Sequence, residues 1–134
     1  HTPYWEEGHY LPEALEAVDF ILRDHRTGEV RHIDPALLDL LWAMQQSVEG
    51  QERQRAFHVI SGYRSPSTNK ALRASSNGVA KYSLHQVGKA IDIRLPGNSI
   101  GQLRKAAVAL EQGGVGYYPR SDFVHVDTGR VRYW

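Results

Sequence analysis

The sequence contains no cysteine, and this absence removes several kinds of chemistry at once. A chain without thiols has no disulfide framework, no thiol nucleophile and no cysteine-ligated zinc. The absence says little about compartment, because an oxidising environment permits disulfides without requiring them. Any metal bound by this chain must therefore be held by histidine, aspartate or glutamate side chains.

The sequence also lacks an excess of one charge and a long apolar run. Its 16 basic and 15 acidic side chains leave a net charge of +1, which argues against the broad basic surface of a nucleic-acid-binding protein. No apolar run reaches the roughly 20 residues that cross a bilayer, and no signal-peptide pattern opens the chain. We therefore expect no nucleic-acid partner and no membrane span. Because the sequence starts at His1, we also expect that an export signal has been removed.

The length of 134 residues predicts a single domain, large enough to bury a core without disulfides or a structural metal. No internal repeat, low-complexity tract or linker divides it. Residues 1–10 are aromatic and polar without a period, which predicts an extended arm packed on the body. No heptad pattern demands a partner subunit, so we expect a monomer.

Apolar residues at helical spacing predict four helices. Pro12 suits the first turn of the first helix, and Asp34 followed by Pro35 is typical of an N-cap at the start of the second. Ser99 is the expected N-cap of the fourth. The predicted helices cover residues 12–26, residues 35 to about 49 with a stop at Gly50, a segment opening at Ser65-Pro66, and residues 100–110 with a stop at Gly113-Gly114.

Short alternating runs predict four strands, at residues 57–60, 90–94, 115–118 and 123–127. Residues 119–122 form a hairpin signal between the last two strands, and the tail at 128–134 is polar and aromatic. With helices mostly first and strands later, the predicted fold is α+β: N-terminal helices packed on a small antiparallel sheet that carries the functional residues.

Three residues in the second half of the chain can form a metal site. His85 precedes a predicted strand that carries Asp92, and His125 lies in the predicted strand 123–127. Two histidines and one aspartate give zinc three ligands and leave a position open for water, which suits hydrolysis. The alternative is that His85 is a surface loop residue, that Asp92 is a strand-end carboxylate paired with a nearby arginine, and that His125 is a half-buried imidazole. His58, in the predicted strand 57–60, is interpreted as a core or edge histidine rather than a ligand.

Three further side chains are candidates for roles around such a metal. Asp122, in the predicted turn, could serve as a general base, although turn aspartates usually bond their own backbone. Asp127 points to the same face as His125 in a regular strand and is either a partner that orients that ligand or the base itself. Arg64 follows a strand end, where it can clamp a carboxylate or an oxyanion, or form a structural salt bridge.

The segments SGYRS, SLHQVGKAID and FVHVDTG, taken in this order and spacing, resemble the M15 family of zinc peptidases, the D-alanyl-D-alanine carboxypeptidase and hedgehog type. The chain looks most similar to the small bacterial murein endopeptidases of that family. The resemblance covers residues 57–134 closely and extends over the helices before them.

The resemblance implies that zinc is bound by His85, Asp92 and His125. It implies that Arg64 holds substrate or stabilises the tetrahedral intermediate and that Ser83 lines the site. The position three residues before the last ligand, which holds the catalytic acid or base in many relatives, is here Asp122. Relatives often have a longer Glu or a His near that position, so Asp127 stays open as its rival.

The implied activity is hydrolysis of amide bonds in the stem-peptide crosslinks of peptidoglycan by a metal-activated water, including crosslinks that join two diaminopimelate residues. The implied location is periplasmic or otherwise extracytoplasmic. Two alternatives stay open: a D,D- or L,D-carboxypeptidase acting on the same substrate class, and a non-catalytic zinc-containing module that binds the cell wall.

Overall fold

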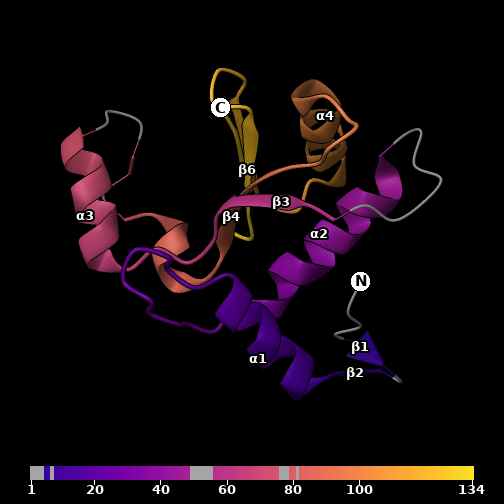
Figure 1. Cartoon of the computed structure of the whole chain (residues 1–134). Coiled ribbons are helices and arrows are strands. Elements are labelled where there is room, and N and C mark those ends of the chain that lie inside the picture. Colours follow the sequence, from indigo (N-terminus) through magenta and orange to yellow (C-terminus); the bar gives the residue numbers. More distant parts are fainter. Residues whose placement is uncertain (1–4, 7, 49–55, 76–78, 81) are drawn as a thin grey trace.

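A computed structural model describes residues 5–6, 8–48, 56–75, 79–80 and 82–134. Its centre is a five-stranded sheet with the strand order β3-β4-β6-β5-β7 (Figure 1). All neighbouring strands are antiparallel except the pair β5 and β7, which is parallel. The strands are β3 (His58–Ser61), β4 (Ala90–Arg94), β5 (Gly114–Tyr118), β6 (Phe123–Asp127) and β7 (Arg132–Tyr133).

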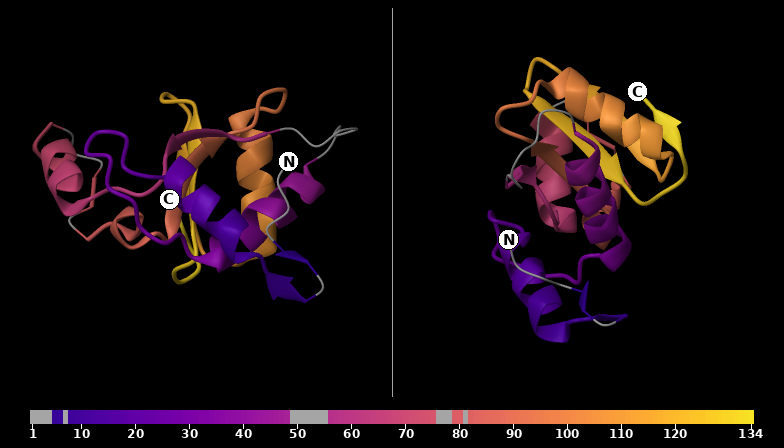
Figure 2. Two further views of the ribbon diagram at one scale, coloured as in Figure 1. Left: turned by 60° about the horizontal axis from the view of Figure 1, so that its bottom comes forward. Right: turned by 90° about the vertical axis from the view of Figure 1, so that its right-hand side faces the viewer.

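Helices lie on both faces of this sheet. Figures 1 and 2 show α2 and α4 on one face, whereas α3 and the short 3-10 helix η1 lie beyond the other. The helices are α1 (Pro12–Ile21), α2 (Pro35–Ser47), α3 (Pro66–Ser75), η1 (Leu84–Val87) and α4 (Ile100–Leu110). None of the helices in the described ranges is long and apolar enough to cross a membrane. The α+β prediction is confirmed, with a mixed sheet in place of a purely antiparallel one.

The alternation of side chains along β4 and β6 separates the core from the functional face. Ile91 and Ile93 of β4, with Val124 and Val126 of β6, are buried in one apolar cluster. The cluster also contains Leu37 and Met44 of α2 and Leu103 of α4. Because successive strand residues point to opposite faces, the residues between these apolar ones point away from α2 and α4.

The predicted helix starts are accurate, while the predicted ends are less so. Asp34 caps α2 by accepting a hydrogen bond from the backbone N–H of Ala36 at 3.0 Å. Ser99 and Gln102 form a reciprocal capping box at α4. The end predicted for the second helix, at residues 49 and 50, lies outside the described residues. Gly114, expected to stop the fourth helix, already belongs to β5.

The first helix ends at Ile21 rather than at residue 26, because a side chain captures the backbone that would continue it. The buried carboxylate of Asp24 accepts hydrogen bonds from the N–H groups of Arg26 and Thr27, at 2.8 and 3.1 Å. Such local side-chain bonds compete with helix formation. Burial opposes ionisation of Asp24, but hydrogen bonds from Ser65 and its other donors outweigh it and hold the pKa below its usual range.

Two pairings differ from the prediction. Where an extended arm was expected at residues 1–10, the described part forms a hairpin of β1 (Trp5–Glu6) and β2 (His9–Tyr10), while residues 1–4 and 7 lie outside the described residues. The hydroxyl of Tyr10 donates a hydrogen bond to Asp39 of α2 at 2.7 Å, which fixes β2 on the body. The polar tail contributes β7, which pairs with β5.

Candidate metal centre

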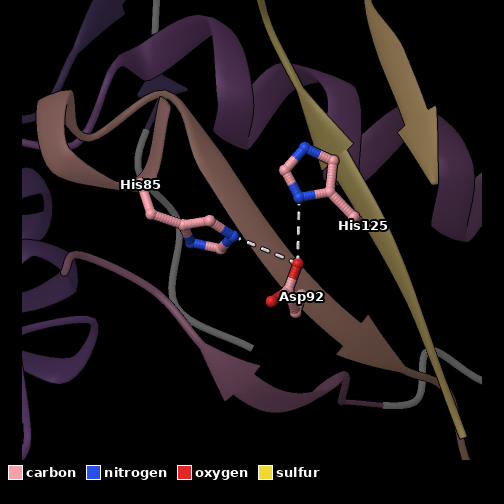
Figure 3. A group of neighbouring side chains, drawn as sticks. All are labelled: His85, Asp92 and His125. Carbon is pink, nitrogen blue, oxygen red and sulfur yellow. Dashed lines mark hydrogen bonds and ion pairs between the residues drawn. The ribbon is translucent and has the colours of Figure 1, made fainter. Parts of the chain in front are cut away.

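The structure brings His85, Asp92 and His125 together on the sheet face opposite α2 and α4 (Figure 3). Asp92 of β4 and His125 of β6 are direct neighbours in the ladder, and His85 reaches them from η1. One carboxylate oxygen of Asp92, Oδ1, lies 3.1 Å from Nε2 of His85 and 3.0 Å from Nδ1 of His125. All three side chains are buried, and one potential ligand atom from each lies within 4.8 Å of the others. The cluster can hold a metal ion.

Local structure around η1 directs His85 toward the sheet. The hydroxyl of Ser83 caps η1 by accepting a hydrogen bond from the backbone N–H of His85 at 3.1 Å. Gly88 ends η1 with φ +70°, and a Cβ there would lie 2.3 Å from the carbonyl oxygen of His32. Only glycine fits this left-handed, crowded position. The chain therefore reverses at Gly88 and continues into the strand that carries Asp92.

Each imidazole has a hydrogen-bond acceptor on the side away from Asp92. Nδ1 of His85 lies 2.8 Å from the carbonyl oxygen of Gly62, and Nε2 of His125 lies 2.7 Å from a carboxylate oxygen of Asp127. A neutral imidazole has one N–H, and donating it outward leaves the inner nitrogen as a lone pair. The two inner lone pairs and the Asp92 carboxylate then converge, which is the donor arrangement of a metal site with oriented histidines. The donor set fits a metal cation.

The electrostatics of the cluster favour an ionised Asp92 between the two imidazole rings. Burial opposes ionisation of Asp92, but without a metal the inner ring nitrogens of His125 and His85 can donate to its carboxylate, and these contacts hold the pKa of Asp92 below its usual range. Burial likewise opposes protonation of His125, yet the Asp127 and Asp92 carboxylates raise its pKa above the ordinary value. Negative charge is therefore available on both sides of the His125 ring to balance a cation.

Asp127 lies behind His125, fully buried. Its carboxylate accepts hydrogen bonds from the backbone N–H groups of Gly114 and Gly129, at 3.0 and 2.9 Å, and from Arg132 at 3.1 and 2.9 Å. Burial would raise its pKa, but the hydrogen bonds from His125, Arg132 and the backbone lower it overall. Both oxygens thus accept hydrogen bonds and the group stays ionised, which suits orientation of His125 better than acceptance of a proton.

Asp122 lies at the rim rather than in the centre. It occupies the turn before β6 in the left-handed region, with φ +58°, and its side chain is 62% exposed. Its carboxylate lies 3.6 Å from Nε of Arg94, two residues beyond Asp92 on β4. Asp122 is not among the residues that line the cavity described below. The two carboxylates considered as bases therefore occupy different places, one beneath a ligand and one outside the cavity.

Arg64 lies beside the cluster and is held by residues that the sequence analysis did not single out. Its Nη2 is 3.5 Å from Oδ2 of Asp92, and its Nη1 donates to Oδ1 of Asn69 at 3.2 Å. Asn69, buried on α3, also donates to the carbonyl oxygen of Ala80 at 2.9 Å. Next to Arg64, the N–H of Ser65 donates to Asp24 at 2.9 Å. The sequence signal for Asn69 was its position five residues after the arginine in a polar helix.

A cavity of about 500 Å³ opens above the cluster, with the three candidate ligands in its wall. Arg64 and Ser83 also line it. The other lining residues come from the segment that leads into η1, from the first residue of η1 and from the end of the sheet: Val79, Ala80, Tyr82, Leu84, Tyr118, Ser121, Phe123, Arg132 and Trp134. His58 is exposed on the edge strand β3 and lies outside the cluster. The arrangement offers a metal site that a peptide-sized molecule can reach.

Residues 1–134 match a family described as "Peptidoglycan L,D-endopeptidase MepK". The protein of that name from Escherichia coli K12 is 45% identical over 125 residues, which cover 93% of this chain and 67% of the relative. A "Probable peptidoglycan L,D-endopeptidase MepK" from Haemophilus influenzae is also 45% identical, over 93% of this chain and 66% of the relative. No solved structure is significantly similar to the chain.

Proposed function

Because this chain belongs to the MepK family of peptidoglycan L,D-endopeptidases, we propose that it is a zinc-dependent endopeptidase that hydrolyses amide bonds in the peptide crosslinks of peptidoglycan. The observation that carries this proposal is the buried His-Asp-His cluster in the wall of an open cavity. We propose that the bond cleaved is an L,D amide bond, because the similar relatives are named peptidoglycan L,D-endopeptidases.

We propose that Nε2 of His85, a carboxylate oxygen of Asp92 and Nδ1 of His125 hold the zinc ion. Three protein ligands are typical of catalytic zinc, whereas structural sites close the fourth position with a further residue. When bound, zinc would supply a Lewis acid and lower the pKa of a bound water toward neutrality. Asp127 keeps the outer nitrogen of His125 protonated, so that the inner nitrogen stays a ligand.

Arg64 is proposed to stabilise negative charge that develops on the attacked carbonyl oxygen. Its guanidinium lines the cavity and is buried beside Asp92, so it is oriented before the substrate arrives. Burial lowers the pKa of Arg64, and the negative charge of the neighbouring Asp92 offsets part of that decrease. Ser83 is proposed to contact substrate, because it lines the same cavity.

Asp122 is proposed as the general base that carries the proton to the departing amine. Its carboxylate is largely exposed and has one ion-pair contact, with Arg94 at 3.6 Å, whereas both oxygens of Asp127 already accept hydrogen bonds. General acid–base groups of this kind contribute about 10²- to 10⁴-fold to the rate. Extracytoplasmic action follows from the proposed substrate, and we propose that the protein acts as a monomer.

The test is digestion of defined muropeptides with zinc-loaded protein, followed by mass spectrometry of the products. Cleavage between crosslinked stem peptides at an L,D bond is expected, and chelation should abolish it. Release of a single terminal residue would instead identify a carboxypeptidase. Affinity for peptidoglycan with bound zinc and no product would identify a wall-binding module.

A further inference from the structure

One wall of the cavity is a fixed group of aromatic side chains from the end of the sheet. Trp134, directly after β7, donates a hydrogen bond from Nε1 to the hydroxyl of Tyr118 at 2.7 Å. The Tyr118 ring stacks on Phe123 with 4.7 Å between ring centroids. All three side chains line the cavity. We call Tyr118, Phe123 and Trp134 the aromatic wall.

Trp134 occupies a place that the sheet leaves open for it. Gly116 of β5 is the ladder neighbour of His125, and a Cβ at Gly116 would lie 2.7 Å from the Trp134 ring. The indole therefore lies over Gly116, with its centroid 5.1 Å from that of the His125 ring. Arg132 lies 4.9 Å from the same indole and holds Asp127. The missing side chain at Gly116 thus places an indole directly beside a proposed metal ligand.

The indole is fixed and yet exposed. Trp134 is 47% exposed although its N–H is paired and its ring contacts His125 and Arg132. An aromatic surface that is held rigidly in a cavity loses little freedom when a ligand covers it, so it contributes binding free energy efficiently. The exposed indole surface is therefore suited to contact with an apolar part of the substrate.

The cavity wall offers both polar side chains and the aromatic wall. Arg64 and Ser83 come from the segments before α3 and η1, whereas the aromatic wall comes from β5, β6 and the residue after β7. A crosslinked stem peptide has matching parts: amide and carboxylate groups, and the methylene chain of the diamino acid through which the crosslink is made. The charged parts suit Arg64, and the methylene chain suits the indole.

We propose that Trp134 is a specificity-determining residue that binds the methylene chain of the crosslinking diamino acid, and that Gly116 sets its position. This inference rests on the proposed function, since it assigns part of that substrate to a part of the same cavity. It adds a requirement that metal binding alone does not make: the enzyme must distinguish crosslinks by the length of the aliphatic chain.

The experiment compares two synthetic crosslinked peptides that differ only in this chain, one made with a natural-length diamino acid and one shortened by two methylenes. Zinc-loaded wild-type protein should favour the longer peptide at least about tenfold in kcat/KM, the usual scale for methylenes in an apolar pocket. Trp134→Leu should raise KM for the longer peptide and reduce the preference to about threefold or less. Its zinc affinity should stay within about twofold of wild type.

Gly116→Ala provides a second variant, because the chain keeps Trp134 while the new methyl group pushes the indole out of its place. The backbone of Gly116 is outside the left-handed region, so alanine acts there through the contact with Trp134. We expect it to reduce the preference as Trp134→Leu does. Trp42→Leu is the matched control, since Trp42 is 50% exposed on α2, across the sheet. It should retain the wild-type preference, and thermal denaturation confirms that each variant folds.

An unchanged preference in folded Trp134→Leu and Gly116→Ala would overturn the proposal. A loss of zinc affinity with the preference retained would also overturn it, because Trp134 would then only support His125. If the wild type cleaves neither peptide, the proposed function fails separately. The affinities of both peptides for zinc-loaded protein, measured by calorimetry, then give the same comparison without turnover.

Discussion

Replacing Asp127 with asparagine separates the orientation of a ligand from proton transfer. The carboxylate accepts hydrogen bonds from His125, Arg132, Gly114 and Gly129, with no exposure to solvent. Asparagine offers one carbonyl oxygen and one NH₂ group. If the NH₂ group faces His125, Nε2 of the ring must accept a hydrogen bond from it. The ring proton then moves to Nδ1, the nitrogen proposed as a zinc ligand. If the NH₂ group instead faces the backbone N–H groups of Gly114 and Gly129, hydrogen-bond donors point at one another in a buried site and lack acceptors.

Either arrangement of Asp127→Asn carries a large cost. Leaving buried donors around position 127 unsatisfied should lower the free energy of unfolding by about 1 to 3 kcal/mol. Loss of the carboxylate that orients a ligating histidine should weaken zinc binding by about 10- to 100-fold. Chelator competition measures the affinity, and urea unfolding of metal-free protein measures the stability.

Asp122→Asn is the comparison for Asp127→Asn. Asp122 is largely exposed and contacts Arg94, so its replacement should leave zinc affinity and stability nearly unchanged while kcat falls by about 10²- to 10⁴-fold. Asp127→Asn should instead show both thermodynamic losses. The reasoning is refuted if Asp127→Asn binds zinc normally and unfolds normally but loses kcat, because Asp127 would then act as the base.

Three further predictions concern the ligands and their supports. Zinc at about 100 times its Kd should stabilise the wild-type protein by about 2.7 kcal/mol, which raises its Tm by about 10 °C. His85→Ala should abolish this increase in Tm, while the exposed control His58→Ala should keep it. An increase in the Tm of His85→Ala on adding zinc would contradict the ligand assignment. Asn69→Ala should lower kcat/KM by about 10- to 100-fold at unchanged zinc affinity, because Arg64 loses its partner; normal kinetics would show that Arg64 needs no such support. The folded-state pKa of Asp24 is depressed, so its contribution to stability is present at pH 7 and is lost as the pH falls below about 4. Asp24→Asn should therefore cost about 2 to 3 kcal/mol at pH 7 and less at pH 3 in urea titrations, and an equal loss at both pH values would argue against this account.

The candidate cluster could be predicted from sequence because two of its members lie in strands of period two. Asp92 and His125 each alternate with isoleucine or valine, so one apolar face predicts that both polar side chains share the other. The register that makes them direct neighbours is a property of the folded sheet and of its turns. His85 lies outside these strands, so no local period identifies it, and its candidacy rested on its place in a loop seven residues before Asp92 and on the resemblance to a family.

The parts that were missed depend on contacts between segments far apart in sequence. The two-residue strand β7 is too short to show a period, and it forms because Gly114 and Gly116 leave room for Arg132 and Trp134. The early end of α1 depends on Asp24, whose carboxylate also receives the N–H of Ser65 from 41 residues away. In both places tertiary contacts override the local pattern.

The charges around the cluster explain how one site can bind a metal and attract an anionic group. Asp92 and Asp127 lie on either side of His125, and each contacts an arginine, Arg64 and Arg132 respectively. With neutral imidazoles the two carboxylates and the two guanidinium groups cancel. A divalent cation would therefore leave the cavity with an excess of about two positive charges in a partly buried setting, where they are weakly screened. Such a cavity favours carboxylate-bearing peptides and stabilises negative charge on an attacked carbonyl, the two requirements of the proposed reaction.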